Sequence, residues 1–275
     1  MAKIIPIFKC NDASLFNNYR PISLLSIFSK ILEKIMYDRL YEYVIELRIL
    51  YEYQFGFQKK KSTYMAIICL LDMLIKALEK GEFGIGVFID FRKAFDTVDH
   101  QILLDKLHHY GIRGTALTWF TNYLCNRKQF VEFENTKSSL LSVKCGVPQG
   151  SILGPLLFLI YINDLAHVSP KLFAILFADD SNFFCTGPNL NELVTTVNHE
   201  LKNIVHWLNA NRMSLNVEKT HYIVFSNRGK TTNLDTNVQI AGSVIEKVNF
   251  TKFLGIIIDK NFTWKFHVDH VCSKK

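Results

Sequence analysis

Two adjacent acidic residues stand in the middle of a short apolar segment, Leu-Phe-Ala-Asp-Asp-Ser-Asn-Phe-Phe, at residues 176–184. Residues typical of strands lie on both sides, so the segment predicts a hairpin with Asp179 and Asp180 at its tip. Asp and Ser are common turn residues, and a tight turn by itself accounts for the pair. The alternative is a divalent cation between the carboxylates, which would offset their repulsion and the cost of desolvating them. A third acid elsewhere in the chain would favour the cation.

Asp90 is the candidate for that third acid, because it ends the apolar run Gly-Val-Phe-Ile-Asp-Phe. Taken alone, an acid at the end of a strand is equally a helix cap or an ion-pair partner. Three carboxylates together can hold two Mg²⁺ ions about 4 Å apart, an arrangement that promotes in-line displacement at phosphorus. The acids therefore predict phosphoryl transfer, provided that the fold brings Asp90 to Asp179 and Asp180.

The elements that must position these acids follow from periodicity and end signals. Apolar residues at helical spacing predict a helix within 23–50, and Ser62-Thr63 and Gly81 are typical of the two ends of a second helix. The remaining expected elements are a strand at 84–91, helices at 98–110 and 115–126, strands at 128–135 and 140–145, a Gly/Pro loop at 146–150, a helix from Gly154-Pro155, the acidic hairpin, a helix at 190–211 and short strands to 258. Because strands and helices interleave without strict alternation, we predict an α+β fold with an antiparallel sheet and helices packed on one face.

Composition limits the class of protein without naming it. The chain has 275 residues, 49% of them hydrophobic, and a net charge of +7, which suits an anionic partner. The six cysteines form no C-x-x-C pair, so we interpret them as reduced core thiols of an intracellular protein. The longest apolar stretch, 152–162, is too short to span a bilayer, and the first residues do not resemble a secretory signal.

Seven segments follow one another in the order of the successive blocks of a reverse transcriptase. These segments are residues 18–40, 54–63, 87–100, 146–165, 176–184, 207–225 and 253–258. Together they resemble the reverse transcriptase of non-LTR (LINE-type) retrotransposons, and the resemblance extends from about residue 4 to 260. The residues before the acids, Phe177 and Ala178, are similar to those of the non-LTR branch, whereas many other reverse transcriptases have Tyr at the position of Phe177.

The resemblance implies a fingers-and-palm polymerase fold. A reverse transcriptase domain would occupy 1–260, with fingers at about 1–85 and palm at about 86–260. Residues 261–275 would begin a following element, so that the thumb is largely missing. Both ends of the sequence lead us to expect a fragment of a longer polypeptide, without the endonuclease that non-LTR elements use for priming.

The resemblance also implies roles at the reacting centre. Asp90, Asp179 and Asp180 correspond to the metal-binding acids of the palm, with the backbone carbonyl of Phe91 assisting. The metal would be Mg²⁺, as two ions, with Mn²⁺ as the alternative. Lys219 corresponds to a lysine that protonates the departing pyrophosphate, although an exposed lysine after a strand also serves solubility.

Three further positions correspond to nucleotide-binding residues. Phe95 matches the steric gate that clashes with a ribose 2′-hydroxyl, with core packing as its alternative reading. Gln149 matches a residue that contacts the incoming nucleotide, and Lys59 lies where cations meet the triphosphate. Gln58 departs from the family, because many relatives have Arg there and would gain a bidentate phosphate contact.

Other polar residues have less specific readings. Lys60 and Lys61 are expected to meet nucleic-acid phosphates, and Arg20 is expected to reach template backbone or to form a salt bridge. Asp96 and Asp99 are too far along the chain to be metal ligands, so we predict a turn residue and a helix-start residue.

The function implied is that of an RNA-directed DNA polymerase that adds dNTPs to a primer 3′-hydroxyl by two-metal phosphoryl transfer. Its partners would be an RNA template, a DNA primer and dNTPs, without a membrane. The protein would act inside the cell, in the nucleus or the cytoplasm. The alternative is a nucleic-acid-binding remnant of a decayed element that no longer catalyses. An intron-encoded maturase with a similar palm is a weaker third reading.

Overall fold

The computed structural model describes residues 2–9, 12–125, 127–134, 136–227 and 236–273. The chain divides into two compact units, and each unit is built from two separate stretches of sequence. The first unit comprises Met1–Tyr51 and Lys93–Asn163, and the second comprises Glu52–Arg92 and Asp164–Lys275. Both combine helices with strands, so the predicted α+β class is confirmed.

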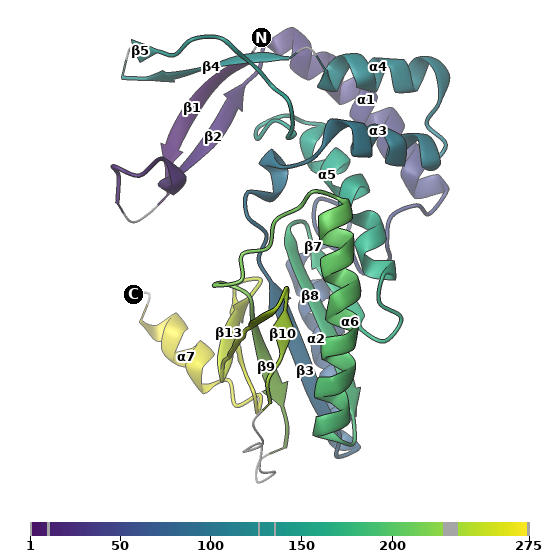
Figure 1. Cartoon of the computed structure of the whole chain (residues 1–275), viewed down its shortest axis with the longest axis vertical. Coiled ribbons are helices and arrows are strands. Elements are labelled where there is room, and N and C mark those ends of the chain that lie inside the picture. Colours follow the sequence, from purple (N-terminus) through teal and green to yellow (C-terminus); the bar gives the residue numbers. More distant parts are fainter. Residues whose placement is uncertain (1, 10–11, 126, 135, 228–235, 274–275) are drawn as a thin grey trace. The chain divides into compact units, whose positions relative to one another are not determined.

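The first unit contains a small sheet and several helices (Figure 1). Its helices are α1 (Ile27–Glu46), α3 (His100–His109), α4 (Gly114–Leu124) and α5 (Gly154–Ile162), with 3₁₀ turns at Phe16–Asn18 and Ala94–Asp96. Its strands are β1 (Ala2–Phe8), β2 (Tyr19–Leu24), β4 (Lys128–Phe133), β5 (Thr136–Lys137) and β6 (Leu141–Ser142). Strand β1 pairs antiparallel with β2 and parallel with β4, and β5 and β6 both pair with β4.

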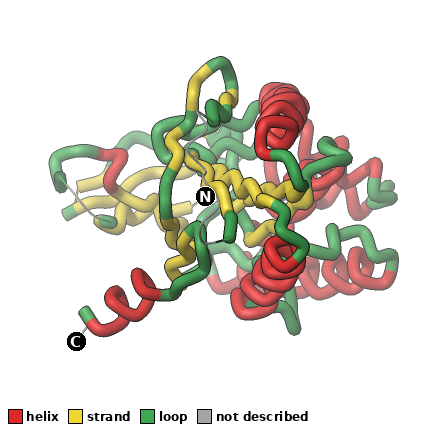
Figure 2. The backbone as a smooth tube through the Cα atoms, turned by 90° about the horizontal axis from the view of Figure 1, so that it is seen from below, coloured by secondary structure: helices red, strands yellow, loops and turns green. Residues whose placement is uncertain are grey.

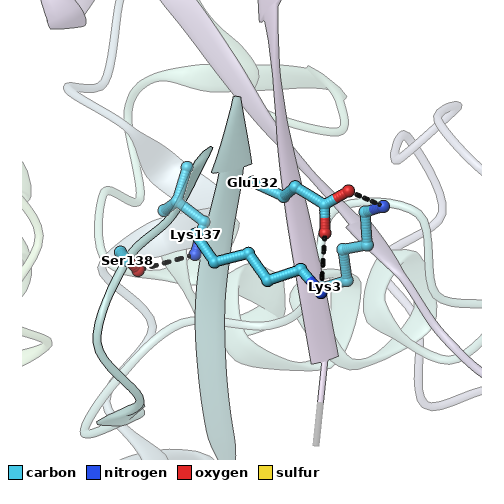
Figure 3. A network of polar contacts seen from close by, with 5 residues as sticks. Lys3, Glu132, Lys137 and Ser138 are labelled. Carbon is cyan, nitrogen blue, oxygen red and sulfur yellow. Dashed lines mark hydrogen bonds and ion pairs between the residues drawn. The ribbon is translucent and has the colours of Figure 1, made fainter. Parts of the chain in front are cut away.

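An ion-pair network crosses this small sheet. Glu132 on β4 accepts a hydrogen bond from Lys3 Nζ on β1 at 2.6 Å, and Lys137 Nζ lies 3.9 Å from its other oxygen (Figure 3). Ion pairs at the surface contribute less than about 1 kcal/mol, so backbone pairing rather than this network sets the strand register.

Helix ends follow the signals in the sequence. The Ser62 hydroxyl caps the helix that begins at Thr63, and Asp99 caps α3 by accepting from the Gln101 amide at 2.9 Å. Gly81 and Gly111 follow their helices with φ of 74° and 93°, a conformation that glycine adopts without strain. The predicted helix-start role of Asp99 is confirmed.

The apolar stripe of α1 forms a helix as predicted, but its first turns are not buried. Ile27, Phe28, Ile31 and Leu32 are exposed, whereas Leu40 and Val44 near the end of the helix are buried. Periodicity thus predicts the helix correctly and leaves open which part of it joins a core.

The second unit is built on a five-stranded sheet in the order β12-β9-β3-β8-β7. Its strands are β3 (Phe83–Ile89), β7 (Phe173–Phe177), β8 (Asp180–Gly187), β9 (His221–Phe225) and β12 (Glu246–Lys247). Neighbours pair antiparallel except β12, which pairs parallel with β9, so the predicted antiparallel sheet is correct for all but the edge strand.

Two long helices pack on opposite faces of this sheet: α2 (Thr63–Glu79) and α6 (Leu190–Ala210). A Cβ built on Gly84 would meet Leu74 of α2, and one built on Gly187 would approach Leu193 of α6. Gly84 faces Thr186 across the ladder, and Thr186 precedes Gly187, so Gly84 and Gly187 point to opposite sides. Figure 1 shows α6 in front of the sheet and α2 behind it. The predicted packing of helices on one face is therefore wrong.

The rest of the second unit is a set of short hairpins followed by a helix. These elements are β10 (Gln239–Ile240), β11 (Ser243–Val244), β13 (Phe250–Phe253), β14 (Ile256–Asp259) and α7 (Lys265–Cys272). A further 3₁₀ helix spans Asn163–His167. Figure 2 shows α7 as the helix next to the C-terminal end.

The structure bears on two predictions made from composition, one about membrane spans and one about the cysteines. Among the described residues, no helix is both long and apolar enough to cross a membrane. The five described cysteines are free thiols, but Cys145 and Cys272 are exposed and the other three are only partly buried. Their assignment to the core is therefore wrong for the described residues, and Cys10 lies outside them.

The packing of α2 predicts a contrast between two neighbouring residues. Leu74 is fully buried against the sheet, whereas Ile75 is 43% exposed. Leu74→Ala should lower the free energy of unfolding by about 2–5 kcal/mol, because it leaves a cavity, and Ile75→Ala by less than about 1 kcal/mol. Urea unfolding followed by circular dichroism measures both; equal losses would contradict the described packing.

Candidate active site

Asp90 lies just past the end of the central strand β3. The strand is buried from Gly84 to Ile89, and Phe91 on the far side of Asp90 is buried as well. Strand β3 pairs with β8 in a register that sets Ile89 opposite Ser181. Continuing this antiparallel register by one residue places Asp90 opposite Asp180.

The β7–β8 hairpin carries the other two acids. Phe177 pairs with Asp180, so the loop consists of two residues, Ala178 and Asp179. Asp179 and Asp180 are exposed, while Ala178 beside them is buried. The hairpin therefore ends in the predicted tight turn, and the pairing of β3 with β8 also brings Asp90 close to that turn.

Three carboxylates close together disfavour their own ionisation. Desolvation and the neighbouring charges of Asp179 and Asp90 raise the pKa of Asp180 to about 6, from an ordinary value of 3.8. A raised carboxyl pKa beside other acids indicates a cluster of negative charge that a cation would relieve.

Asn216 connects Asp90 to the turn that carries Lys219. Its side-chain amide donates to Asp90 Oδ2 at 3.0 Å, and its backbone amide donates to the Asp90 carbonyl at 2.9 Å. Its carbonyl accepts from the Lys219 amide and from the Thr220 hydroxyl. Lys219 itself is exposed. Asn216 was not predicted from the sequence, because an Asn in a loop is ordinarily a turn residue and its partner lies 126 residues away.

The donor set suits a hard divalent cation, because all three side chains offer carboxylate oxygens. In the described part of the chain, however, no three His, Cys, Asp or Glu side chains are already arranged around a metal position. The Asp90 carboxylate instead faces the Asn216 amide. The residues therefore fit Mg²⁺ in chemistry and in strand placement, without forming a finished coordination shell.

The predicted nucleotide-binding residues Phe95 and Gln149 belong to the first unit and are linked there. The Phe95 ring stacks on Phe158 with centroids 4.3 Å apart, and its carbonyl accepts from the Val147 amide. Gln149 donates to Asp96 Oδ1 at 2.9 Å. Desolvation raises the pKa of Asp96, against the opposing effect of this hydrogen bond. Asp96 ends a 3₁₀ turn as predicted, but its link to Gln149 was not anticipated.

The glycines of the Gly-Val-Pro-Gln-Gly loop approach the chain itself. Gly146 has φ of 86°, and a Cβ there would lie 2.8 Å from the Asp96 carbonyl oxygen. A cavity of about 290 Å³ adjoins this loop, and Asp96, Arg127, Lys144 and Gln149 are among its lining residues. The cationic side chains give part of that lining a positive charge.

The basic residues predicted to meet phosphates differ in their surroundings. Lys59 and Lys60 are exposed, as is Arg20 on β2. Lys61 is partly buried, and its ammonium donates to the carbonyls of Glu52 and Gln54. Burial lowers the pKa of Lys61.

Gln58, which stands where many relatives have Arg, forms a hydrogen bond within its own loop. Its side-chain amide donates to the Gln54 carbonyl, the same oxygen that Lys61 contacts. The position is therefore engaged within its own loop.

Comparison with known families identifies the chain. The family described as reverse transcriptase (RNA-dependent DNA polymerase) matches residues 9–258. The chain belongs to the reverse transcriptase family. This reverse transcriptase is related to those of non-LTR retrotransposons, as the order of the seven segments predicted. It is 31% identical over 264 residues to the probable RNA-directed DNA polymerase from transposon BS of Drosophila melanogaster.

The reverse transcriptase relatives are much longer than this chain. The match to the transposon BS protein covers 91% of this chain and 28% of that relative. A match to the RNA-directed DNA polymerase from mobile element jockey of Drosophila melanogaster, at 27% identity, covers 98% and 30%. The chain thus spans less than a third of these two relatives.

Solved telomerase structures share the fold of this reverse transcriptase. A telomerase from Candida albicans in complex with a fragment of telomeric RNA aligns with a TM-score of 0.60 at 14% identity, over 94% of this chain and 44% of that one. Apo telomerase from Candida tropicalis aligns with a TM-score of 0.56, also at 14% identity, over 90% and 52%.

The cluster of acids predicts a pH-dependent stability in this reverse transcriptase when divalent cations are removed. The folded pKa of Asp180, about 6, exceeds the ordinary 3.8, so the folded state keeps the proton longer and loses stability as pH rises between these values. Asp180→Asn should therefore be more stable than wild type at pH 7.5 in EDTA. The expected gain is on the order of 1 kcal/mol, since solvent screens this exposed residue. The gain should vanish near pH 3.8, as measured by urea unfolding.

Asp72→Asn is the matched control, because Asp72 pairs with Lys76 on the exposed surface of α2. This variant should show no gain at either pH. An Asp180→Asn variant that is no more stable than wild type at pH 7.5 without cations would contradict the repulsion.

Proposed function

We propose that this chain catalyses RNA-directed DNA synthesis, adding dNTPs to a primer 3′-hydroxyl, as part of a non-LTR retrotransposon polyprotein. The observation that carries the proposal is the pairing of β3 with β8, which sets Asp90 opposite Asp180 and beside Asp179. Family membership makes polymerase chemistry the natural use of three acids at this place. The resulting site would act by positioning and by stabilising charge on the transferred phosphate.

In this mechanism Asp90, Asp179 and Asp180 would hold the cations, with the backbone carbonyl of Phe91 assisting. Two Mg²⁺ ions, or Mn²⁺ in their place, would supply activation of the attacking hydroxyl and charge neutralisation at the leaving phosphate. Asn216 holds the Asp90 carboxylate and backbone, which limits the orientations open to Asp90. Lys219, exposed on the turn that Asn216 anchors, gives its proton to the departing pyrophosphate.

Residues of the first unit select the nucleotide in this proposal. The Phe95 ring, held by stacking on Phe158, excludes a ribose 2′-hydroxyl by steric clash. Gln149, oriented by its hydrogen bond to Asp96, contacts the incoming dNTP.

Exposed cations supply the contacts to phosphates. Lys59 meets the triphosphate, while Lys60 and Arg20 meet the RNA template or the DNA primer. Lys61 contributes charge nearby while its ammonium is bonded to its own loop. We assign about 1–85 to the fingers, about 86–260 to the palm and 261–275 to the start of a following element.

Primer extension on poly(rA)/oligo(dT) with Mg²⁺ tests the proposed reaction. Wild type should extend the primer, and Asp179→Asn should lower the rate by about 100-fold or more, because it removes one of the carboxylates that hold the cations. Asp72→Asn makes the same chemical change on the surface of α2 and should retain the wild-type rate.

Two results would count against the proposed reaction. Extension that survives Asp179→Asn would remove the acids from the mechanism. Binding of the primer–template by wild type without any extension would favour the alternative, a nucleic-acid-binding remnant.

Phe95→Ala tests nucleotide selection separately. Loss of the ring should raise the rate of rNTP relative to dNTP incorporation by about tenfold or more, because the clash with the 2′-hydroxyl is relieved. Single-nucleotide incorporation with matched rNTP and dNTP measures the ratio. Phe133→Ala, which removes an exposed ring on β4, should leave the ratio unchanged. An unchanged ratio in Phe95→Ala would refute the steric gate.

A further inference from the structure

A segment that precedes α2 runs along the edge of the β7–β8 hairpin. The Phe55 amide donates to the Leu176 carbonyl at 2.8 Å, and the Leu176 amide donates to the Tyr53 carbonyl at 3.0 Å. These bonds pair Gln54 with Leu176 in a parallel bridge beside the last strand of the sheet. We call residues 53–56 the hairpin bracket, because they lie against the strand that leads into the acidic turn.

The Gln54 side chain reaches from the bracket to the turn itself. It is 2% exposed, and its Oε1 accepts hydrogen bonds from the Gly56 amide at 2.9 Å and the Ala178 amide at 3.0 Å. Ala178 is the first loop residue of the hairpin and is followed directly by Asp179. One buried side-chain oxygen thus binds the backbone of the hairpin bracket, at Gly56, and the backbone of the hairpin turn, at Ala178.

The turn needs such support, because Ala178 has φ of 55°. A non-glycine residue in the left-handed region is strained and persists only when the surrounding structure holds it. The Ala178 amide is also buried, so it would lack a partner if Gln54 did not accept its hydrogen.

Gly56 lets the bracket lie directly on the turn. A Cβ at position 56 would stand 2.3 Å from the Ala178 nitrogen and 2.9 Å from the Phe177 carbonyl carbon. Gln58 and Lys61 donate to the Gln54 carbonyl, which fixes the bracket from its other side. Within the sequence Gln-Phe-Gly-Phe-Gln, Gln54, Phe55 and Gly56 therefore contact the hairpin directly.

We propose that Gln54 is a positioning residue that fixes the hairpin turn so that Asp179 and Asp180 face Asp90. The inference rests on the proposed function, because it takes these acids to be the cation ligands. Gln54 contacts only backbone amides in this role, so it acts through the turn and not on the substrate. Replacing a residue that orients metal ligands without contacting the metal typically lowers metal affinity by about 10- to 100-fold.

Two substitutions of Gln54 separate the acceptor from the volume. Gln54→Met has similar length and volume but no amide oxygen, so it should weaken Mn²⁺ binding by about 10- to 100-fold, as measured by electron paramagnetic resonance titration. Gln54→Glu keeps an oxygen acceptor in the same place and adds a negative charge that attracts the cation, so a folded Gln54→Glu variant should bind Mn²⁺ at least as tightly as wild type. Gln101→Met makes the same chemical change on exposed α3 and should have no effect.

A folded Gln54→Met variant that binds Mn²⁺ as wild type does would overturn the proposal. Equal weakening by Gln54→Met and Gln54→Glu would also overturn it, because the acceptor would then not be the cause. In primer extension, Gln54→Met should raise the Mg²⁺ concentration for half-maximal rate without a comparable rise in the KM for dNTP. A purely structural defect would not produce that split.

Amide hydrogen exchange in the wild-type chain keeps the proposal testable if Gln54→Met does not fold. The Ala178 and Gly56 amides should exchange at least about 1000-fold more slowly than free peptide, since both are bonded to Gln54. Rapid exchange at Ala178 would overturn the positioning role. This readout is independent of catalysis. Slow exchange at Ala178 in the wild-type chain would support the hairpin bracket. If Asp179→Asn also bound Mn²⁺ as wild type does, the proposed function would be refuted while the bracket remained intact.

Discussion

Repulsion between carboxylates on neighbouring strands is the constraint around which the second unit is organised. The register of β3 and β8 cannot shift by one residue without turning buried side chains such as Val87 and Phe183 to the other face. The same register sets Asp90 opposite Asp180, and desolvation together with the neighbouring charges of Asp179 and Asp90 raises the pKa of Asp180 to about 6. Hydrophobic packing on both faces of the sheet thus stabilises an arrangement of charges that would not form by itself.

Polar contacts behind the acids complete this arrangement. Asn216 holds Asp90 through its side chain and its backbone, and Gln54 holds the turn that presents Asp179. Both residues offer amide groups that satisfy buried or constrained partners without adding charge to an already negative cluster. The site is thereby built from strand ends and loops, while the two long helices supply the packing that keeps the strands in place.

Local signals in the sequence predicted much of this structure. Ser62 and Gly81 mark the ends of α2 because capping and left-handed backbone depend on a few adjacent residues. The approach of Asp90 to Asp179 and Asp180 was also predictable. Each acid lies next to an apolar strand, and a cation between Asp179 and Asp180 called for a third carboxylate. Helix packing on one face was predicted wrongly, because an apolar stripe does not say which side of a sheet it covers. The exposed first turns of α1 show the same limit. The partners of Gln54 and Asn216 could not be foreseen, since they lie 124 and 126 residues away.

Crystals of the chain soaked in MnCl₂ and measured at the manganese absorption edge would test most directly whether these acids hold divalent cations. Anomalous density should appear between Asp90 and the hairpin tip, with carboxylate oxygens of Asp90 and of Asp179 or Asp180 about 2.2 Å from the ion. Manganese found only at other surface carboxylates, with the Asp90 side chain still bonded to Asn216, would contradict the account.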